Sequence, residues 1–227
     1  MYEIILPLRC LLLKSNDLKK WEKLMTMESH NDIRRGMTAL WSRNQDVIVN
    51  RLRNLWGIKD YTDEEIHTVC GIIEVNSFEV GQNGARARAL FPSAFYLAHD
   101  CCPNTTHTDH PLSHSLTVRV IRKVKKGEPI TLSYAYTLQG TLKRRSHLQE
   151  CKFFWCVCER CTDPTELTSY SSAIQCPKCN SGIILSINPL QQEAPWKYVH
   201  IHRHLFLFFF FNNFFVFILD VIHAVTQ

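Results

Sequence analysis

Residues 98–104 read Ala98-His99-Asp100-Cys101-Cys102-Pro103-Asn104, and the organisation of the whole chain follows from this stretch. An apolar run over residues 95–98 predicts a buried helix or strand that ends at His99. Cys101 next to it is a soft metal ligand, and Pro103-Asn104 then breaks regular structure. We therefore expect a loop that carries a metal ligand directly after a buried segment.

A second group of thiols comes later, in Cys156-Val157-Cys158-Glu159-Arg160-Cys161. Three thiolates at this spacing need a fourth ligand to close a tetrahedral zinc site, and Cys101 is the natural fourth. Zinc would then pin the His99 loop against the segment that ends at Cys161, and the residues between them would line a pocket.

Another pair of cysteines, Cys176 and Cys179, lies in a CxxC spacing that is half a zinc site. The chain has no later cysteine, and three histidines that follow are better interpreted as accidental than as ligands: His200, His202 and His204.

The composition indicates a globular protein of one or two domains, with 227 residues, 45% hydrophobic and 21% charged. The ten cysteines, in a chain without a recognisable signal peptide, favour metal binding over disulfides. A net charge of +5 permits an acidic partner without requiring one. The basic residues between Arg119 and Lys126 indicate a solvated hairpin rather than a nucleic-acid patch, because no row of aromatic residues accompanies them.

The pattern along the chain predicts both helices and strands. Residues 16–60 are helix-rich, with Leu18, Trp21, Leu24 and Met25 on one face. Thr62 and Glu65 form a capping box that starts a helix through about residue 73. We expect strands over residues 74–80 and 115–122, a return strand over 129–134 after a turn at 125–128, and a basic helix over 141–151. Asn76 lies among apolar neighbours, so its amide either binds a ligand or holds a turn.

The two ends of the chain differ from the rest. The apolar stretch 1–13 is expected to continue a structure that begins earlier. The Phe-rich stretch 205–222 approaches the length of a membrane span, but Asn212, Asn213 and Asp220 interrupt it. Our hypothesis is that it is translated intron sequence and that the true protein ends near Tyr198. The alternative is a membrane anchor.

Six motifs occur in a fixed order: residues 74–78, 90–92, 98–104, 127–134, 152–161 and 163–166. Together they resemble the SET- and MYND-domain (SMYD) family of protein lysine methyltransferases, and within it the arthropod-type SmydA branch. The resemblance covers roughly residues 4–198. It implies a C-terminal fragment that lacks the MYND finger and the first SET strands.

The resemblance implies an α+β fold in which SET-domain β-sheets carry a helical insert and a zinc-binding post-SET segment. The expected parts are the helical SET insert (1–73), the C-terminal part of the SET domain (74–136), the post-SET zinc segment (137–166), a partial second zinc knuckle (167–198) and the hydrophobic tail (199–227).

The resemblance also implies a role for each matching residue. The cofactor would be S-adenosylmethionine, and Tyr134 would be catalytic, at the point of methyl transfer. Phe78 would line the lysine channel. The cofactor contacts would be Asn76, Ala98, His99, Tyr134 and Phe154; the zinc ligands would be Cys101, Cys156, Cys158 and Cys161, with Cys176 and Cys179 in a second, incomplete site.

The implied function is methyl transfer to a lysine of a histone or non-histone protein, with a role in chromatin and transcription regulation. We expect a monomer in the nucleus, the cytoplasm or both, with a protein substrate and no direct nucleic-acid binding. Three departures favour an alternative, a catalytically inactive zinc-binding interaction or scaffold module. The family's Gly-rich strand that cradles the cofactor is missing, Ala98 stands where the family has Asn with Asp100 in place of the following Ser, and Lys152 stands where the family has a second active-site Tyr.

Overall fold

The computed structural model describes residues 2–81, 87–110, 113, 115–179, 182–191 and, for the backbone, 196–199. The predicted hydrophobic tail spans 199–227, and all of it after residue 199 lies outside the described residues. His200, His202 and His204 are therefore outside them too. The chain divides into two compact units. The first unit contains residues Met1–His99, Pro103–Leu132 and Glu150–Phe153, and the second contains Asp100–Cys102, Ser133–Gln149 and Phe154–Gln227.

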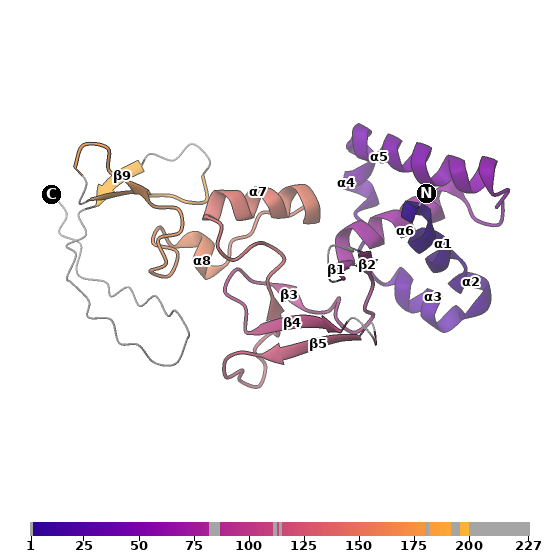
Figure 1. The fold of residues 1–227 in the computed structure, drawn as a ribbon, viewed down its shortest axis with the longest axis horizontal. Helices are drawn as coiled ribbons and strands as arrows, with labels where there is room; N and C mark the ends of the chain where they lie inside the picture. The colour runs from indigo at the N-terminus through magenta and orange to yellow at the C-terminus, as the bar shows by residue number, and fades with distance from the viewer. Residues whose placement is uncertain are drawn as a thin grey trace. The chain divides into compact units, whose positions relative to one another are not determined.

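Helices dominate the first half of the chain and short strands follow (Figure 1). The elements are η1 (Tyr2–Ile4), α1 (Ile5–Leu11), α2 (Leu13–Asn16), α3 (Leu18–Met25), α4 (Asn31–Gly36), α5 (Thr38–Asn44), the π-helical turns η2 (Gln45–Val49) and η3 (Arg51–Leu55), α6 (Asp63–Asn76), β1 (Phe78–Val80), β2 (Ala87–Ala89), β3 (Ala98–His99), β4 (Thr105–His110), β5 (Ser115–Val120), β6 (Thr131–Leu132), α7 (Thr141–Lys152), α8 (Glu159–Thr162), β7 (Ile174–Gln175), β8 (Ile183–Ser186) and β9 (Trp196–Val199). The predicted α+β class is confirmed.

Helix α6 is the centre of the first unit, and α1, α3, α4 and α5 pack against it (Figure 1). Its capping box forms as predicted: the Glu65 N–H donates to Thr62 Oγ1 (3.1 Å), and the Thr62 N–H donates to Glu65 Oε2 (2.8 Å). Ile66, Val69 and Ile72 are fully buried in the helical core. This helix therefore fixes the point at which the following strand β1 begins.

The expected strand over residues 74–80 is wrong in its first half, because α6 continues to Asn76 and only Phe78–Val80 is extended. Side chains from other helices hold the last turn: Arg34 Nε and Asn44 Nδ2 each donate to the Glu74 carboxylate at 2.8 Å. Asn76 Nδ2 donates to the Ile72 carbonyl one turn back (2.9 Å). These tertiary contacts override the local strand preference.

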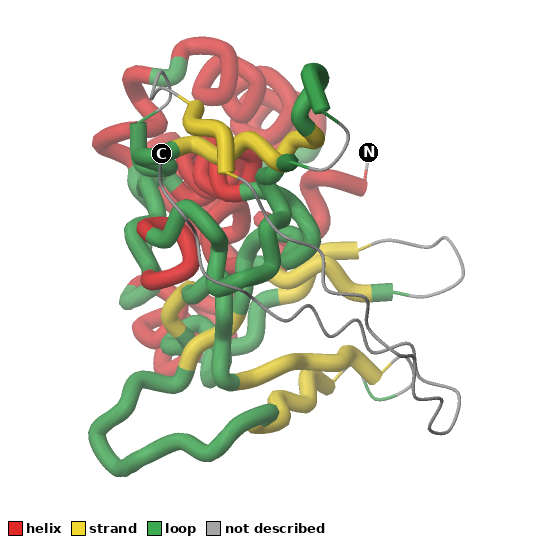
Figure 2. The backbone as a smooth tube through the Cα atoms, turned by 90° about the vertical axis from the view of Figure 1, so that its left-hand side faces the viewer, coloured by secondary structure: helices red, strands yellow, loops and turns green. Residues whose placement is uncertain are grey.

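The strands form small separate sheets with loops between them (Figure 2). In the first unit β1 pairs with β2 and β4 with β5, both antiparallel, while β3 pairs with β6 in parallel. The predicted strand at 115–122 is confirmed as β5, but its partner is β4 and not the segment after the turn at 125–128. That later segment forms β6 beside β3, so the expected hairpin is wrong.

The second unit has a small core of its own, made of Cys101, Ala135, Leu148, Cys156 and Cys161. The basic helix expected at 141–151 is confirmed as α7. The apolar face predicted for residues 18–25 of the first unit is confirmed only in part. Trp21 and Leu24 are buried there, whereas Leu18 is 58% exposed.

Candidate functional site

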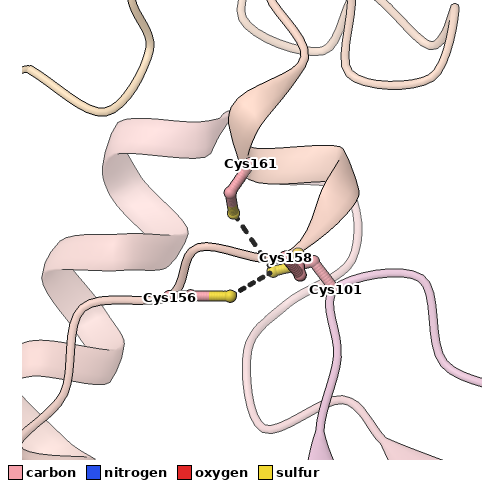
Figure 3. Close-up of side chains that lie close together, drawn as sticks. All are labelled: Cys101, Cys156, Cys158 and Cys161. Atoms are coloured by element: carbon pink, nitrogen blue, oxygen red, sulfur yellow. Dashed lines mark hydrogen bonds between the residues drawn. The ribbon is translucent and has the colours of Figure 1, made fainter.

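Four cysteines of the second unit converge, and their sulfur atoms all lie within 4.8 Å of one another (Figure 3). Cys101 comes from the loop after β3, Cys156 from the loop after α7, and Cys158 and Cys161 from the start and the third residue of α8. The Sγ–Sγ distances from Cys101 are 3.9 Å to Cys156 and 3.5 Å to Cys161. A tetrahedral zinc ion with Zn–S bonds of about 2.3 Å places its sulfurs about 3.8 Å apart. The cluster fits zinc.

Hydrogen bonds between residues close in the sequence hold the backbone around three of these cysteines: Cys101, Cys158 and Cys161. The Cys102 N–H donates to Asp100 Oδ1 (2.7 Å), which makes a tight turn at Cys101. The carbonyl of Cys158 accepts the Cys161 N–H (2.9 Å), so the first turn of α8 holds these two ligands together. A short-range bond within α8 thus brings together two of the four ligands, Cys158 and Cys161.

The cluster is buried and its thiols share protons. Cys101, Cys156 and Cys161 are each at most 4% exposed. Hydrogen bonds from Cys101 and Cys156 lower the pKa of Cys161 to about 7, and a bond from Arg144 acts in the same direction. Hydrogen bonding to Cys101 raises the pKa of Cys156. Part of the cluster is therefore readily deprotonated, as metal ligation requires.

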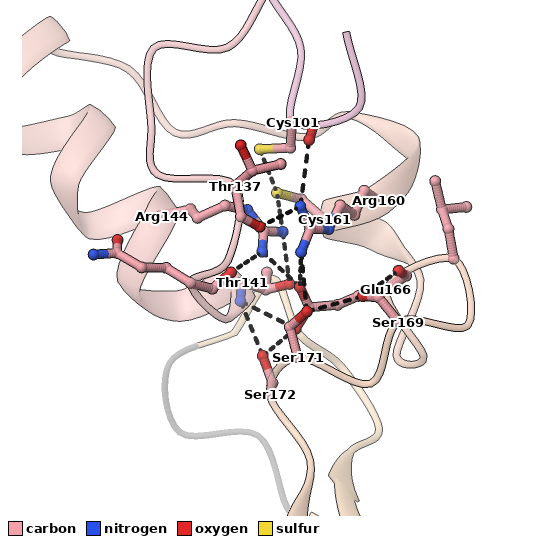
Figure 4. Close-up of polar contacts among 12 residues, drawn as sticks. Cys101, Thr137, Thr141, Arg144, Arg160, Cys161, Glu166, Ser169, Ser171 and Ser172 are labelled. Carbon is pink, nitrogen blue, oxygen red and sulfur yellow. Dashed lines mark hydrogen bonds and ion pairs between the residues drawn. The ribbon is translucent and has the colours of Figure 1, made fainter. Parts of the chain in front are cut away.

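A buried polar network surrounds the cysteines (Figure 4). Arg144 and Glu166 are both at most 1% exposed, and Arg144 Nη1 donates to Glu166 Oε2 at 2.5 Å. Arg160 Nη2 lies 3.4 Å from the same oxygen. Ser172 Oγ donates to Glu166 Oε1. Sequence reasoning missed these residues, although Glu166 belongs to a motif noted at 163–166.

The candidate residues of the first unit lie at the ends of α6, β1 and β3. Asn76 ends α6, and its Nδ2 donates to the carbonyls of Glu28 (2.8 Å) and Ile72 (2.9 Å). Phe78 opens β1 and makes edge contacts with Phe91 (5.7 Å) and His107 (5.4 Å), measured between ring centroids. Ala98 and His99 form β3 beside Thr131 and Leu132 of β6.

The other two candidates, Tyr134 and Phe154, lie in the second unit and pack against its core. Burial raises the pKa of Tyr134, so its hydroxyl stays protonated near neutral pH. Tyr134 and Phe154 thus pack against the same small core, whereas Asn76, Phe78 and the pair Ala98-His99 each have different contacts in the first unit. Their assembly into one cofactor site remains a prediction.

Lys152, which is expected from the resemblance to stand where the family has a tyrosine, belongs to the first unit. Its Nζ donates to the carbonyl of Val75 at 2.5 Å, one residue before Asn76. Burial lowers the pKa of the Lys152 amine. A cation therefore lies beside the end of α6.

Cys176 and Cys179 of the expected second knuckle both lie among the described residues. Cys176 is buried, and its Sγ accepts the Lys178 N–H at 3.4 Å. Within the described part of the chain, only the Cys101 cluster gathers three or more side chains able to hold a metal ion. None of the helices among the described residues is both long and apolar enough to cross a membrane.

Comparison with known proteins identifies relatives of one kind. The family model described as the SET domain matches residues 4–135. The chain is 33% identical over 147 residues to SET domain-containing protein SmydA-8, isoform B, of Drosophila melanogaster, covering 62% of this chain and 32% of that protein. It is 26% identical over 140 residues to histone-lysine N-methyltransferase Smyd1 of Mus musculus, covering 56% and 29%. It is 35% identical over 74 residues to N-lysine methyltransferase SMYD2 of Homo sapiens, covering 33% and 17%.

Proposed function

This chain belongs to the SET-domain family, and from that membership we propose that it acts as a SMYD-type protein lysine N-methyltransferase. The proposed cofactor is S-adenosylmethionine and the proposed substrate is a lysine of a histone or non-histone protein. The observation that carries the proposal is that the family match at 4–135 spans Asn76, His99 and Tyr134. The mouse and human relatives above are named as lysine methyltransferases. The chain covers at most about a third of each relative's length, so the activity of a whole relative enters only as this proposal.

The residues of this chain would serve such a reaction by positioning and by excluding water. S-adenosylmethionine, when bound, supplies a methyl group on a sulfonium. The protonated hydroxyl of Tyr134 would orient the attacking amine, because methyl transfer depends on alignment. Phe78, with Phe91 and His107 at its edge, would line the lysine channel. Burial lowers the pKa of His107 and keeps that ring neutral, so this surface favours the neutral, nucleophilic amine.

The zinc centre would hold the post-SET segment in place. Cys101, Cys156, Cys158 and Cys161 would be its ligands, since their sulfur spacing and burial suit a structural ion with no open coordination position. Cys176 and Cys179 remain a proposed half-site for a second ion. We further propose a nuclear or cytoplasmic role in chromatin and transcription regulation.

One observation favours a second candidate function, a zinc-binding interaction module without catalysis. The Asn76 amide nitrogen is committed to two backbone carbonyls, and Lys152 Nζ binds the carbonyl of Val75 next to it. A lysine cation at the cofactor site would repel both the sulfonium and a substrate lysine. Ala98 likewise offers no side-chain hydrogen bond to a cofactor.

The deciding experiment is isothermal titration of S-adenosylmethionine into the zinc-loaded full chain. Saturable binding that Tyr134→Phe or His99→Ala weakens supports the methyltransferase, and mass spectrometry of histone peptides then tests transfer. Tyr136→Phe is the matched control, because Tyr136 is 65% exposed and lies two residues from Tyr134. A folded, zinc-loaded chain that binds no cofactor would refute the methyltransferase and leave the interaction module.

A further inference from the structure

Three arginines surround the four cysteines, and each one contacts a different ligand segment. Arg144 Nη2 donates to Cys161 Sγ at 3.6 Å, Arg145 Nε donates to the Cys156 carbonyl at 2.9 Å, and Arg160 Nη1 donates to the Cys101 carbonyl at 3.4 Å. Their exposed fractions are 0%, 5% and 6%. Figure 4 shows Arg144 and Arg160 with Cys101 and Cys161. The ligand segments are therefore held by side chains that are themselves out of water.

The buried charges around the four cysteines do not sum to zero. Among the described residues, Glu166 is the carboxylate that pairs with these arginines, at 2.5 Å from Arg144 and 3.4 Å from Arg160. Three guanidinium groups and one carboxylate leave two positive charges in a dry environment, which is costly unless they are compensated. A divalent ion on four thiolates carries two negative charges. A divalent ion bound by the four thiolates would therefore neutralise the two excess positive charges of Arg144, Arg145, Arg160 and Glu166.

Arg144 differs from the other two arginines because it contacts a sulfur atom. Its guanidinium is fixed from three other sides, by Glu166, by the carbonyl of Gln139 and by Thr141 Oγ1 (3.2 Å). An N–H donated to a thiolate draws electron density from the sulfur and fixes its direction. Arg145 and Arg160 instead donate to the backbone carbonyls of Cys156 and Cys101.

We propose that Arg144 is a positioning residue of the metal centre, which orients Cys161 and neutralises part of the tetrathiolate charge. This inference rests on the zinc centre of the proposed function and is independent of methyl transfer. Residues that hold metal ligands in this way are typically worth a 10–100-fold change in metal affinity. We expect Arg144→Gln to weaken zinc binding by about that factor.

The test uses the full chain with Zn²⁺ or Co²⁺ as the only metal. Zinc affinity is measured by competition with a chromophoric chelator, and Co²⁺ reports the sulfur-to-metal charge-transfer band. Arg145→Gln is the matched control, because it removes the same buried charge from the same helix but no bond to sulfur. Arg144→Gln should weaken zinc binding and move the band to lower energy, whereas Arg145→Gln should leave the band in place. Arg144→Lys, which keeps the charge, should recover part of the affinity.

Each possible result of this experiment either supports or overturns the role of Arg144 at the metal centre. Wild-type affinity and an unmoved band in Arg144→Gln would overturn the role of Arg144 while leaving the zinc centre intact. A wild-type chain that takes up neither metal would overturn both. If Arg144→Gln does not fold, Arg144→Lys is compared with the wild type instead. It should bind zinc more weakly than the wild type, and wild-type affinity together with an unmoved band in that variant overturns the proposal.

Discussion

Asn104 and Thr131 bind each other reciprocally, although 27 positions separate them. The Asn104 N–H donates to Thr131 Oγ1 at 3.0 Å, and the Thr131 N–H donates to Asn104 Oδ1 at 2.8 Å. Asn104 Nδ2 also donates to the Pro129 carbonyl at 2.8 Å, and Asn104 is fully buried. This one side chain therefore attaches the segment before β6 to the loop after β3, and it helps to place Thr131 and Leu132 beside β3 and not beside β5.

Replacing Asn104 with Ala should destabilise the first unit by about 3 kcal/mol. The change removes three side-chain hydrogen bonds and leaves the Thr131 N–H and the Pro129 carbonyl without these partners in a buried site. Urea unfolding measures the loss. Asn54→Ala is the control, because Asn54 is exposed and its loss should cost less than about 0.5 kcal/mol. Equal stabilities of the two variants would contradict this account.

Removing zinc should unfold the second unit, because binding of a structural zinc ion, worth about 10 kcal/mol in small metal domains, is folding free energy. Thermal unfolding with and without a chelator measures the effect. Alkylation followed by mass spectrometry should show Cys101, Cys156 and Cys161 becoming reactive only after chelation. Exposed Cys102 should react in both states and serves as the internal control. Unchanged thermal stability after complete chelation would exclude a structural ion.

Acid should destabilise the second unit through Glu166. Burial disfavours its charged form, but hydrogen bonds from Ser172 and Arg144 outweigh burial and lower the pKa of Glu166 below its usual 4.5. Its stabilising contribution is thus present above pH 4.5 and is lost as the pH falls through the lowered pKa of the folded state.

Glu166→Gln should cost about 3–5 kcal/mol at neutral pH, because Arg144 and Arg160 lose their counter-charge. It should also flatten the acid dependence of unfolding. Urea titrations of the zinc-free and zinc-loaded chain across the acid range measure both effects and separate them from metal release. A variant with the acid profile of the wild type would show that another group is responsible.

His67 should make the first unit sensitive to mild acid. It is 2% exposed and stacks on Trp41 at 3.7 Å between ring centroids, and its Nε2 lies 2.8 Å from Gln45 Oε1. Burial, then the charge of Arg34, lowers the pKa of His67 from 6.5. The unfolded chain therefore binds a proton first as the pH falls below 6.5, and stability decreases over that range. His67→Gln should weaken this pH dependence in urea unfolding, and an unchanged slope would contradict it.

Replacing Lys152 with Tyr should strengthen binding of S-adenosylmethionine by about tenfold, or ~1.4 kcal/mol, because it removes one like charge from the proposed cofactor site. Isothermal titration measures the change. Lys143→Tyr is the control, since it removes a charge from an exposed position of the same helix. Equal affinities of the wild type and Lys152→Tyr would show that Lys152 does not act on the cofactor.

Most of the metal-site residues could be predicted from the sequence because they form a short motif with the spacing of zinc ligands. The Cys-x-Cys-x-x-Cys run predicts three ligands because one turn of α8 closes it, and Cys101 follows from the need for a fourth. The surrounding charges were missed because Arg144 and Glu166 meet only across 22 positions, and neither residue type is expected to be buried. Strand β4 was also missed, since its sequence, Thr-Thr-His-Thr-Asp-His, is polar on both faces.

The sequence by itself determined the α+β class, the start of α6 at its capping box and the four cysteines of the metal centre. The capping box and the Cys156–Cys161 run rest on patterns within a few residues, whereas Cys101 follows from the need for a fourth ligand and the fold class from the resemblance. Only the tertiary structure decided that α6 continues to Asn76, that β5 pairs with β4, and that Arg144 and Arg160 share the Glu166 carboxylate beside the thiols. The reason is physical: strand partners and buried ion pairs join groups that are distant in the chain, and their free energy appears only when folding removes both from water.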